Sequence, residues 1–188
     1  MANSVAWKHF SRSQISSLEA ALEHEQCKTL LSMYLGLGGF NEDKVSEGKG
    51  RLTKEEEIVL NFHYYNYAFC KERRFDACAT STFLSIMKDI FDEDMSTDDA
   101  TSSLQASFAR FEGLILCHSV DRPPWTAGTL SPKDVGAITD YVTTSYYRHY
   151  HLYKQVFTTK INLIFEQRHP HNVEEPCVPP ALDRGLML

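Results

Sequence analysis

A proline-stiffened corner near residue 125 constrains the fold of this chain more than any other feature. Residues 121–128 read DRPPWTAG. This segment cannot be helical, because its prolines fix φ, lack an N–H donor and push the residue before each of them toward an extended conformation. Ser131, Pro132 and Asp134 then supply an N-cap, a first-turn proline and a third-position carboxylate. The sequence therefore predicts a sharp turn followed by a long helix from Pro132 to about Phe157.

Four further helices are predicted from apolar residues that recur three and four positions apart. They cover residues 13–35, a segment from the capping box of Thr53 and Glu56 to Arg74, residues 78–91, and a segment capped by Ser96 or Thr97. The acidic run DEDMSTDD at residues 92–99 is predicted to end the third helix and to link it to the fourth. The second helix is apolar or aromatic on nearly every face, which predicts a central place in a bundle.

The long helix after the corner carries two adjacent apolar stripes. One consists of Val135, Ile138, Val142, His149, Leu152 and Val156, and the other of Tyr146, Tyr150, Tyr153 and Phe157. Beyond it, alternating residues at 161–165 predict a short extended segment, and the tail from His169 is rich in proline. We therefore expect an all-α, single-domain bundle of about five helices with a short extended C-terminal segment. Its parts are an N-terminal arm (1–12), a helical domain (13–168) and a proline-rich tail (169–188).

Composition excludes several classes of partner. The 188 residues carry a formal net charge of -6, so the chain as a whole offers no basic surface for nucleic acid or for an anionic membrane. Its five cysteines are an odd number without CxxC pairing, which is typical of a protein from a reducing compartment. The N-terminus has no secretory signal, and no stretch is long and apolar enough to span a bilayer. These features predict a soluble intracellular protein.

No set of residues in the sequence forms a recognisable reaction centre or metal site. His149 and His151 point about 200° apart on a helix, and the consecutive Cys117 and His118 diverge by about 100°. The acidic run at 92–99 matches the first positions of a calcium loop, but Thr97 occupies the place of the required glycine and Ser103 that of the bidentate glutamate. We therefore predict no catalytic, cofactor-binding or metal-binding residues, and a protein that is not an enzyme.

Tyrosines crowd the helix after the corner, and they cannot all lie on one of its faces. Tyrosine, tryptophan and arginine are the residues that most often anchor protein interfaces. The predicted partner-binding residues are therefore Trp125, Tyr146, Tyr147, Arg148, Tyr150, Tyr153 and Lys154. The alternative interpretation, a half-buried helix in an aromatic core, has equal weight.

The corner and the tyrosine-rich helix together resemble a known family. HSVDRPPW followed by ITDYVTTSYYRHYHLYKQVFT is similar to the end of the CLAMP-type domain, and NFHYYNYAFCKERRF and STFLSIMKDIF resemble that family's paired helices. The similarity spans roughly residues 52–165. The domain occurs in small subunits of the flagellar central-pair C1a projection and in the ciliary-associated calcium-binding coiled-coil protein of animals. Calcium binding is not carried over, because this chain lacks a competent calcium loop.

The resemblance implies a structural or adaptor subunit of the axoneme in motile cilia. Its location would be the C1a projection of the central apparatus, where it would support assembly and regulation of ciliary beating. Its partners would be other central-apparatus proteins, with calmodulin a further candidate within the same complex. The alternatives are a calcium- or calmodulin-linked ciliary adaptor and a microtubule-associated subunit elsewhere in the axoneme.

Overall fold

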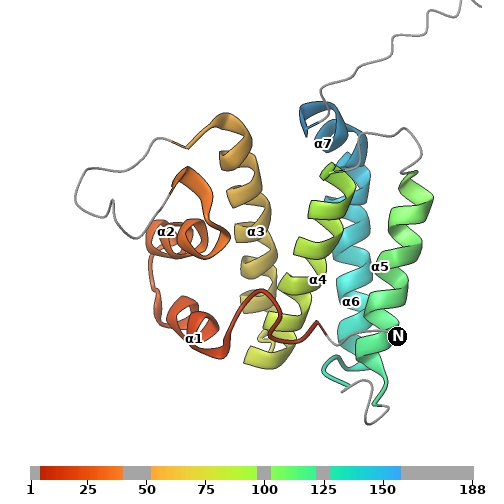
Figure 1. Ribbon diagram of the computed structural model, residues 1–188. Coiled ribbons are helices and arrows are strands. Elements are labelled where there is room, and N and C mark those ends of the chain that lie inside the picture. The colour runs from red at the N-terminus through yellow and green to blue at the C-terminus, as the bar shows by residue number, and fades with distance from the viewer. Residues whose placement is uncertain (1–4, 40–51, 97–102, 122–127, 158–188) are drawn as a thin grey trace, which may run out of the picture.

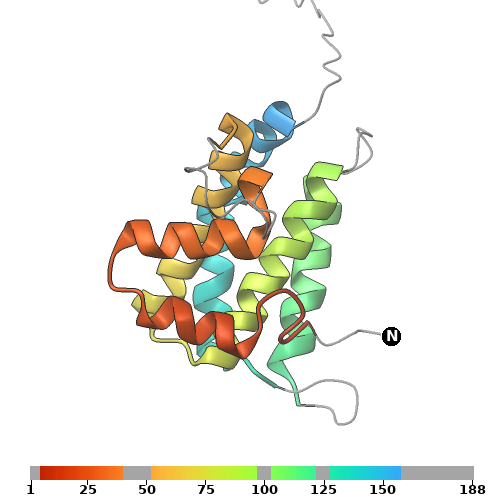
Figure 2. The same ribbon diagram turned by 60° about the vertical axis from the view of Figure 1, so that its left-hand side comes forward.

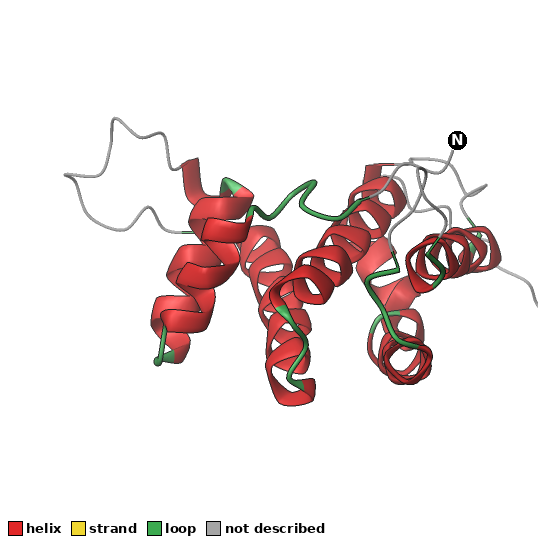
Figure 3. Cartoon of the chain, turned by 90° about the horizontal axis from the view of Figure 1, so that it is seen from below, coloured by secondary structure: helices red, strands yellow, loops and turns green. Residues whose placement is uncertain are grey.

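The computed structural model describes residues 5–39, 52–96, 103–121 and 128–157, and within these ranges every regular element is a helix (Figures 1 and 3). The α-helices are α1 (Arg12–Ala20), α2 (His24–Leu35), α3 (Lys54–Arg73), α4 (Ala77–Ser96), α5 (Leu104–Ser119), α6 (Pro132–Ser145) and α7 (Tyr150–Phe157). Two 3₁₀ turns, η1 (Leu37–Gly39) and η3 (Tyr147–His149), complete the set. The predicted all-α bundle is confirmed. None of the described helices combines the length and the apolar character that crossing a bilayer requires.

Two helix starts lie where the sequence predicts them, because local side chains determine both. Thr53 Oγ1 accepts a hydrogen bond from Glu56 N at 3.2 Å, and the Glu56 carboxylate accepts one from Thr53 N at 2.8 Å. Ser131 and Asp134 form the same reciprocal pair at the start of α6. Each capping box satisfies backbone N–H groups that a helix N-terminus otherwise leaves without partners.

The predicted helix over residues 13–35 is two helices, and this is a first correction. Ala21 and Glu23 both have extended backbone conformations, so α1 ends and α2 starts in a new direction. The break carries α2 across α3, where Cys27 and Leu31 become buried (Figure 2). In the sequence, Leu22 continues the apolar stripe of residues 13–35. In the structure it lies at the break between α1 and α2 and is 89% exposed.

The acidic run does not end α4, and this is a second correction. The helix continues through Asp92 and Asp94 to Ser96, and α5 is capped by Ser103, whose Oγ accepts from Ala106 N at 3.2 Å. The expected cap at Ser96 or Thr97 is therefore wrong. The helix continues because Asp94 lies four residues after Ile90 and three after Phe91 and shares their buried face.

The long helix after the corner changes its buried face part-way along. It consists of α6, η3 and α7, and a 3₁₀ turn advances each residue by 120° rather than 100°, so three residues add roughly 60° of rotation. Val142 is buried before the turn, but Leu152 and Val156 of the same predicted stripe are 60% and 46% exposed after it. The tyrosine stripe faces inward in their place.

Helix α3 lies between two hydrophobic clusters, as its apolar faces predict. Leu60, Tyr64 and Tyr67 pack with α1 and α2, which lie across the bundle, whereas Phe62 and Phe69 pack with α4 and α6 (Figures 1 and 2). Val5 and Phe10 also belong to these clusters, so the described part of the predicted N-terminal arm packs on the helices. The predicted extended segment (161–165) and proline-rich tail (169–188) lie outside the described residues.

Candidate functional site

The predicted partner-binding tyrosines lie in the core at the end of the bundle that contains α7. Tyr146, Tyr147 and Tyr150 are 1%, 6% and 2% exposed. The Tyr146 ring centroid lies 5.4 Å from that of Phe62, which stacks on Phe91 at 4.7 Å. The burial of these three residues favours the alternative interpretation, a helix in an aromatic core, over a partner-binding role for their rings. Tyr146 lies one turn after the buried Val142 and continues its inner face, and Tyr150 lies one turn further along.

The remaining predicted partner residues have different positions. Arg148 is exposed, and Tyr153 and Lys154 are half-buried. The Tyr153 ring packs edge-on against Phe91, with centroids 5.8 Å apart. Trp125 lies outside the described residues. The partner-binding role of Trp125, Arg148, Tyr153 and Lys154 stays a prediction.

A buried carboxylate joins the elements around these tyrosines. Asp94 of α4 is fully buried, and its Oδ2 accepts hydrogen bonds from Ser107 Oγ at 2.5 Å and from Tyr146 OH at 2.8 Å. Its Oδ1 accepts one from Arg110 Nη2 at 2.7 Å. The Asp94 network, which we define as Asp94, Ser107, Arg110 and Tyr146, thus connects α4 to α5 and to the residue that precedes η3.

Two further contacts extend the network to η3 and α7. The Tyr147 and Ser107 hydroxyls lie 3.1 Å apart, within hydrogen-bonding distance. Lys154 Nζ of α7 donates to the backbone carbonyl of Asp94. Because hydrogen bonds to charged groups are stronger than those between neutral groups, the network fixes the orientation of η3 and α7 against α4.

Sequence reasoning missed Asp94 as a structural residue, because it assigned the acidic run to a solvated linker. A signal was present, since Asp94 is spaced from Met87, Ile90 and Phe91 as the next member of a helical apolar stripe. A lone carboxylate on such a stripe is buried only when charged or hydrogen-bonding partners meet it. Those partners come from residues 13 to 52 positions later in the chain.

The phenols of this cluster are protonated, and those of Tyr146 and Tyr141 donate hydrogen bonds to Asp94 and Asn66. Burial raises the pKa of Tyr146 far above its ordinary value, and the neighbouring Asp94 carboxylate raises it further. Burial likewise raises the pKa of Tyr147, which its hydrogen bond with Ser107 partly offsets. Burial raises the pKa of Tyr141 to about 12. These hydroxyls therefore stay protonated at neutral pH, and the cluster serves to hold helices together.

The acidic run that resembles a calcium loop has other partners in this fold. Asp92 Oδ2 lies 2.6 Å from Lys88 Nζ one turn earlier, and Asp94 is held in the buried network. Both residues lie inside α4, so their backbone cannot form the loop that a calcium site of this type requires. Among the described residues, no three His, Cys, Asp or Glu side chains converge as metal ligands.

The histidines and Cys117 do not form a nucleophile and base in the described chain. His118 is buried, and its Nε2 accepts a hydrogen bond from Val5 N at 3.2 Å, which directs the ring toward the N-terminal segment. His149 Nδ1 donates to the carbonyl of Ser145 at 2.7 Å. Each of these contacts is structural.

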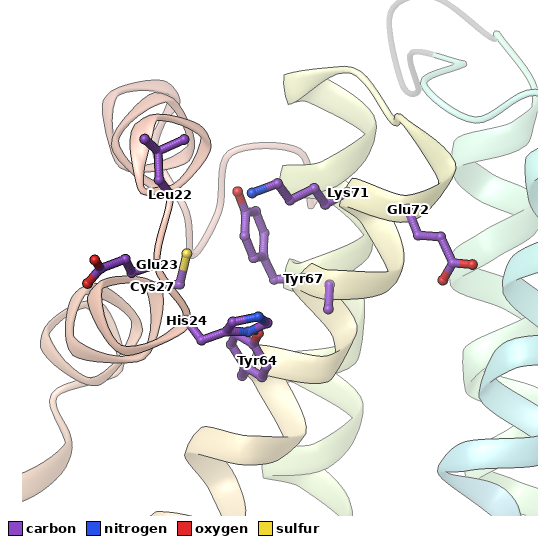
Figure 4. A pocket seen from close by; sticks show the side chains of 9 residues that line it. Leu22, Glu23, His24, Cys27, Tyr64, Tyr67, Lys71 and Glu72 are labelled. Carbon is purple, nitrogen blue, oxygen red and sulfur yellow. The ribbon is translucent and has the colours of Figure 1, made fainter.

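A small pocket of about 320 Å³ lies where the break between α1 and α2 faces α3 (Figure 4). His24 Nδ1 and the Tyr64 hydroxyl form a hydrogen bond in its wall, and the Cys27 thiol donates toward the carbonyl of Ala21 at 3.7 Å. Burial raises the pKa of Tyr67 well above its ordinary value. Three of the polar groups that line the pocket, those of His24, Cys27 and Tyr64, thus have hydrogen-bond partners within the chain.

The outer surface of η3 and α7 is basic and apolar. Leu152 and Val156 lie one turn apart on α7, and Arg148, His149 and His151 are exposed beside them. We call these five residues the α7 face. The stretch 141–165 contains no Asp or Glu, although the whole chain has 25 acidic residues. The α7 face therefore combines one arginine and two histidines with two exposed apolar side chains and has no acidic residue of its own.

A comparison with protein-family models finds one match in this chain. The model of the CLAMP family, described as the flagellar C1a complex subunit C1a-32, matches residues 65–165. The matched region starts within α3 and contains the Asp94 network, the corner and the α7 face. The chain belongs to the CLAMP family of flagellar C1a complex subunits, which places it in the axoneme of the cilium or flagellum.

Proposed function

We propose that this chain is a non-enzymatic structural adaptor that docks through its α7 face onto a neighbouring subunit of the C1a complex. Its role would be to support assembly of the C1a projection and, through it, the regulation of ciliary beating. Membership in a family of C1a complex subunits supplies the cellular setting.

The observation that carries the proposal is the combination of a fixed helix and an exposed apolar pair. The Asp94 network and the packed tyrosine rings hold η3 and α7 on the bundle. Leu152 and Val156 nevertheless remain 60% and 46% exposed. Exposed apolar side chains with polar neighbours form the usual core and rim of a protein interface, and a helix already fixed on the bundle loses little backbone entropy when a partner covers it.

The partner that fits this surface carries acidic residues around an apolar strip. Arg148 and the two exposed histidines of the α7 face would meet carboxylates at the rim, while Leu152 and Val156 would be covered at the centre. Rim charges mainly increase the rate and selectivity of association, whereas the apolar centre contributes most of the affinity.

The test compares two matched pairs of exposed apolar residues. Leu152 and Val156 on α7, and Leu116 and Val120 at the end of α5, are both spaced by four residues and similarly exposed. The variants L152D/V156D and L116D/V120D are expressed in ciliated cells that lack the native chain, and their retention in detergent-extracted axonemes is measured. We expect the α7 variant to be lost and the α5 variant to be retained. Equal loss of both, or loss of the α5 variant alone, would contradict the proposal.

A further inference from the structure

A second surface lies at the opposite end of the bundle from α7. Figure 1 shows α7 at the top and the turn from α3 to α4 at the bottom, next to the start of α6. A pocket of about 390 Å³ opens here, lined by residues 73–76 and 79 on one side and by residues 128–131 and 134 on the other. We call it the arginine pocket, after Arg73 and Arg74.

The acidic side chains of the arginine pocket already have partners. Asp76 Oδ1 accepts a hydrogen bond from Ala79 N at 2.7 Å, which caps the start of α4. Asp134 Oδ2 accepts from Ser131 Oγ at 2.5 Å and from Ser131 N at 3.3 Å, which completes the cap of α6. Asp76 and Asp134 thus each form a cap contact at the start of a helix, and neither carboxylate forms an ion pair with Arg73 or Arg74 among the described residues.

The two arginines have backbones fixed by the end of α3 and, among the described residues, no anionic partner. Both are exposed, and within the described residues no carboxylate lies at ion-pair distance from either guanidinium. The Arg73 guanidinium lies 5.8 Å from the centroid of the Phe69 ring. Arg74 occupies the C-cap of α3 at φ 56°, where its N–H donates to carbonyls of the last turn. The backbone of both residues is therefore fixed by the end of α3.

Guanidinium groups recognise carboxylates through paired N–H donors, and two neighbouring arginines favour a ligand with more than one carboxylate. We propose that the arginine pocket binds an acidic, extended peptide segment of a partner protein. Carboxylates spaced along a peptide can reach Arg73 and Arg74 separately at the rim. A compact multivalent anion would instead lie between the arginines and close to Asp76 and Asp134, whose charges repel it.

The binding assay uses the whole chain and a fluorescein-labelled hexaglutamate peptide, followed by fluorescence anisotropy at low ionic strength. The double variant R73Q/R74Q is expected to bind about tenfold more weakly, the loss that two partly solvated charge contacts account for. The control R12Q/K54Q removes the same charge from an exposed arginine and an exposed lysine outside both proposed binding surfaces, and it is expected to stay within about twofold of the wild type. Equal weakening by both double variants would overturn the proposal.

Two further arms separate the peptide from other ligands. A labelled hexaglutamine peptide is expected not to bind, and binding as tight as that of hexaglutamate would contradict recognition of carboxylates. Phosphate is expected to displace hexaglutamate no more than chloride does at the same ionic strength. Specific displacement by phosphate would overturn the peptide assignment in favour of a small-anion site.

One control tests whether the double variant still folds, and the design of the assay keeps its result independent of the α7 face. Because both arginines are exposed, R73Q/R74Q is expected to show the same thermal unfolding midpoint as the wild type by circular dichroism. If the double variant melts early, the single variants R73Q and R74Q replace it, each with an expected weakening of about threefold. This assay needs no axoneme, so its failure leaves the role of the α7 face untouched, and a failure of axonemal docking leaves the arginine pocket untouched.

Discussion

Removal of the Asp94 carboxylate is the perturbation whose effect the structure defines most fully. Asp94 is fully buried and accepts side-chain hydrogen bonds from Ser107, Arg110 and Tyr146. Asp94→Ala would leave the Ser107 and Tyr146 hydroxyls without this acceptor, at a cost of about 1–3 kcal/mol for each buried unsatisfied group. Arg110 is 31% exposed and can recover hydration, and Ser107 keeps Tyr147 as a neighbour.

These contributions place the expected loss of stability at about 4 kcal/mol, within the range measured when one member of a buried charge pair is removed. For a chain of this size that loss lowers the thermal midpoint by roughly 10 °C. Asp94→Asn keeps part of the hydrogen bonding but loses the charge opposite Arg110, so its effect should be intermediate.

The assay is urea unfolding followed by far-ultraviolet circular dichroism, with Asp92→Ala as the matched control. Asp92 lies two residues away in α4, but it is 53% exposed and pairs with Lys88 at the surface. Its loss should cost less than about 1 kcal/mol. An Asp94→Ala variant as stable as the Asp92→Ala variant would refute the claim that the buried carboxylate holds α4, α5 and the tyrosine cluster together.

Two other predictions concern protonation and calcium. His63 is fully buried without a hydrogen-bond partner for either ring nitrogen, and burial, followed by the charges of Lys88 and His9, lowers its pKa from 6.5 to about 3. Below pH 6.5 the unfolded chain therefore binds a proton that the native state resists, so stability falls as the pH falls, by about 2 kcal/mol at pH 5. His63→Leu should remove this part of the acid sensitivity in urea titrations at pH 7 and pH 5, and an equal acid response in both proteins would contradict the assignment. Calorimetric titration with calcium should give no specific heat, because Asp92 and Asp94 are held inside α4, and a saturable exothermic signal would revive the calcium-linked alternative.

The parts of the fold that the sequence predicts well are those that neighbouring residues determine. The capping boxes of Thr53 and Ser131 define helix starts through contacts three residues long, so a sequence pattern contains all the required information. The central position of α3 also follows from its own composition, since apolar residues on nearly every face must be covered. The family resemblance rests on the corner and the helices beside it, and the family match covers the same region.

Features that depend on distant contacts were predicted less well. The break after Ala20 depends on the position that α2 takes to cover α3. The sequence does not reveal this break, because its apolar residues keep a three- and four-residue spacing across it. Beyond η3 the buried face passes to Tyr150, so Leu152 and Val156 of the predicted apolar stripe face outward. Asp94 becomes a buried acceptor only because α5 and the residue before η3 bring donors to it.

The most direct test of the central claim is site-specific photo-crosslinking within assembled axonemes. A benzophenone amino acid is placed at position 152 on the α7 face or at position 116 on α5, two exposed leucine sites on the same bundle. Our account predicts that position 152 forms adducts with another axonemal protein and that position 116 does not. Adducts at position 116 together with none at position 152 would contradict it.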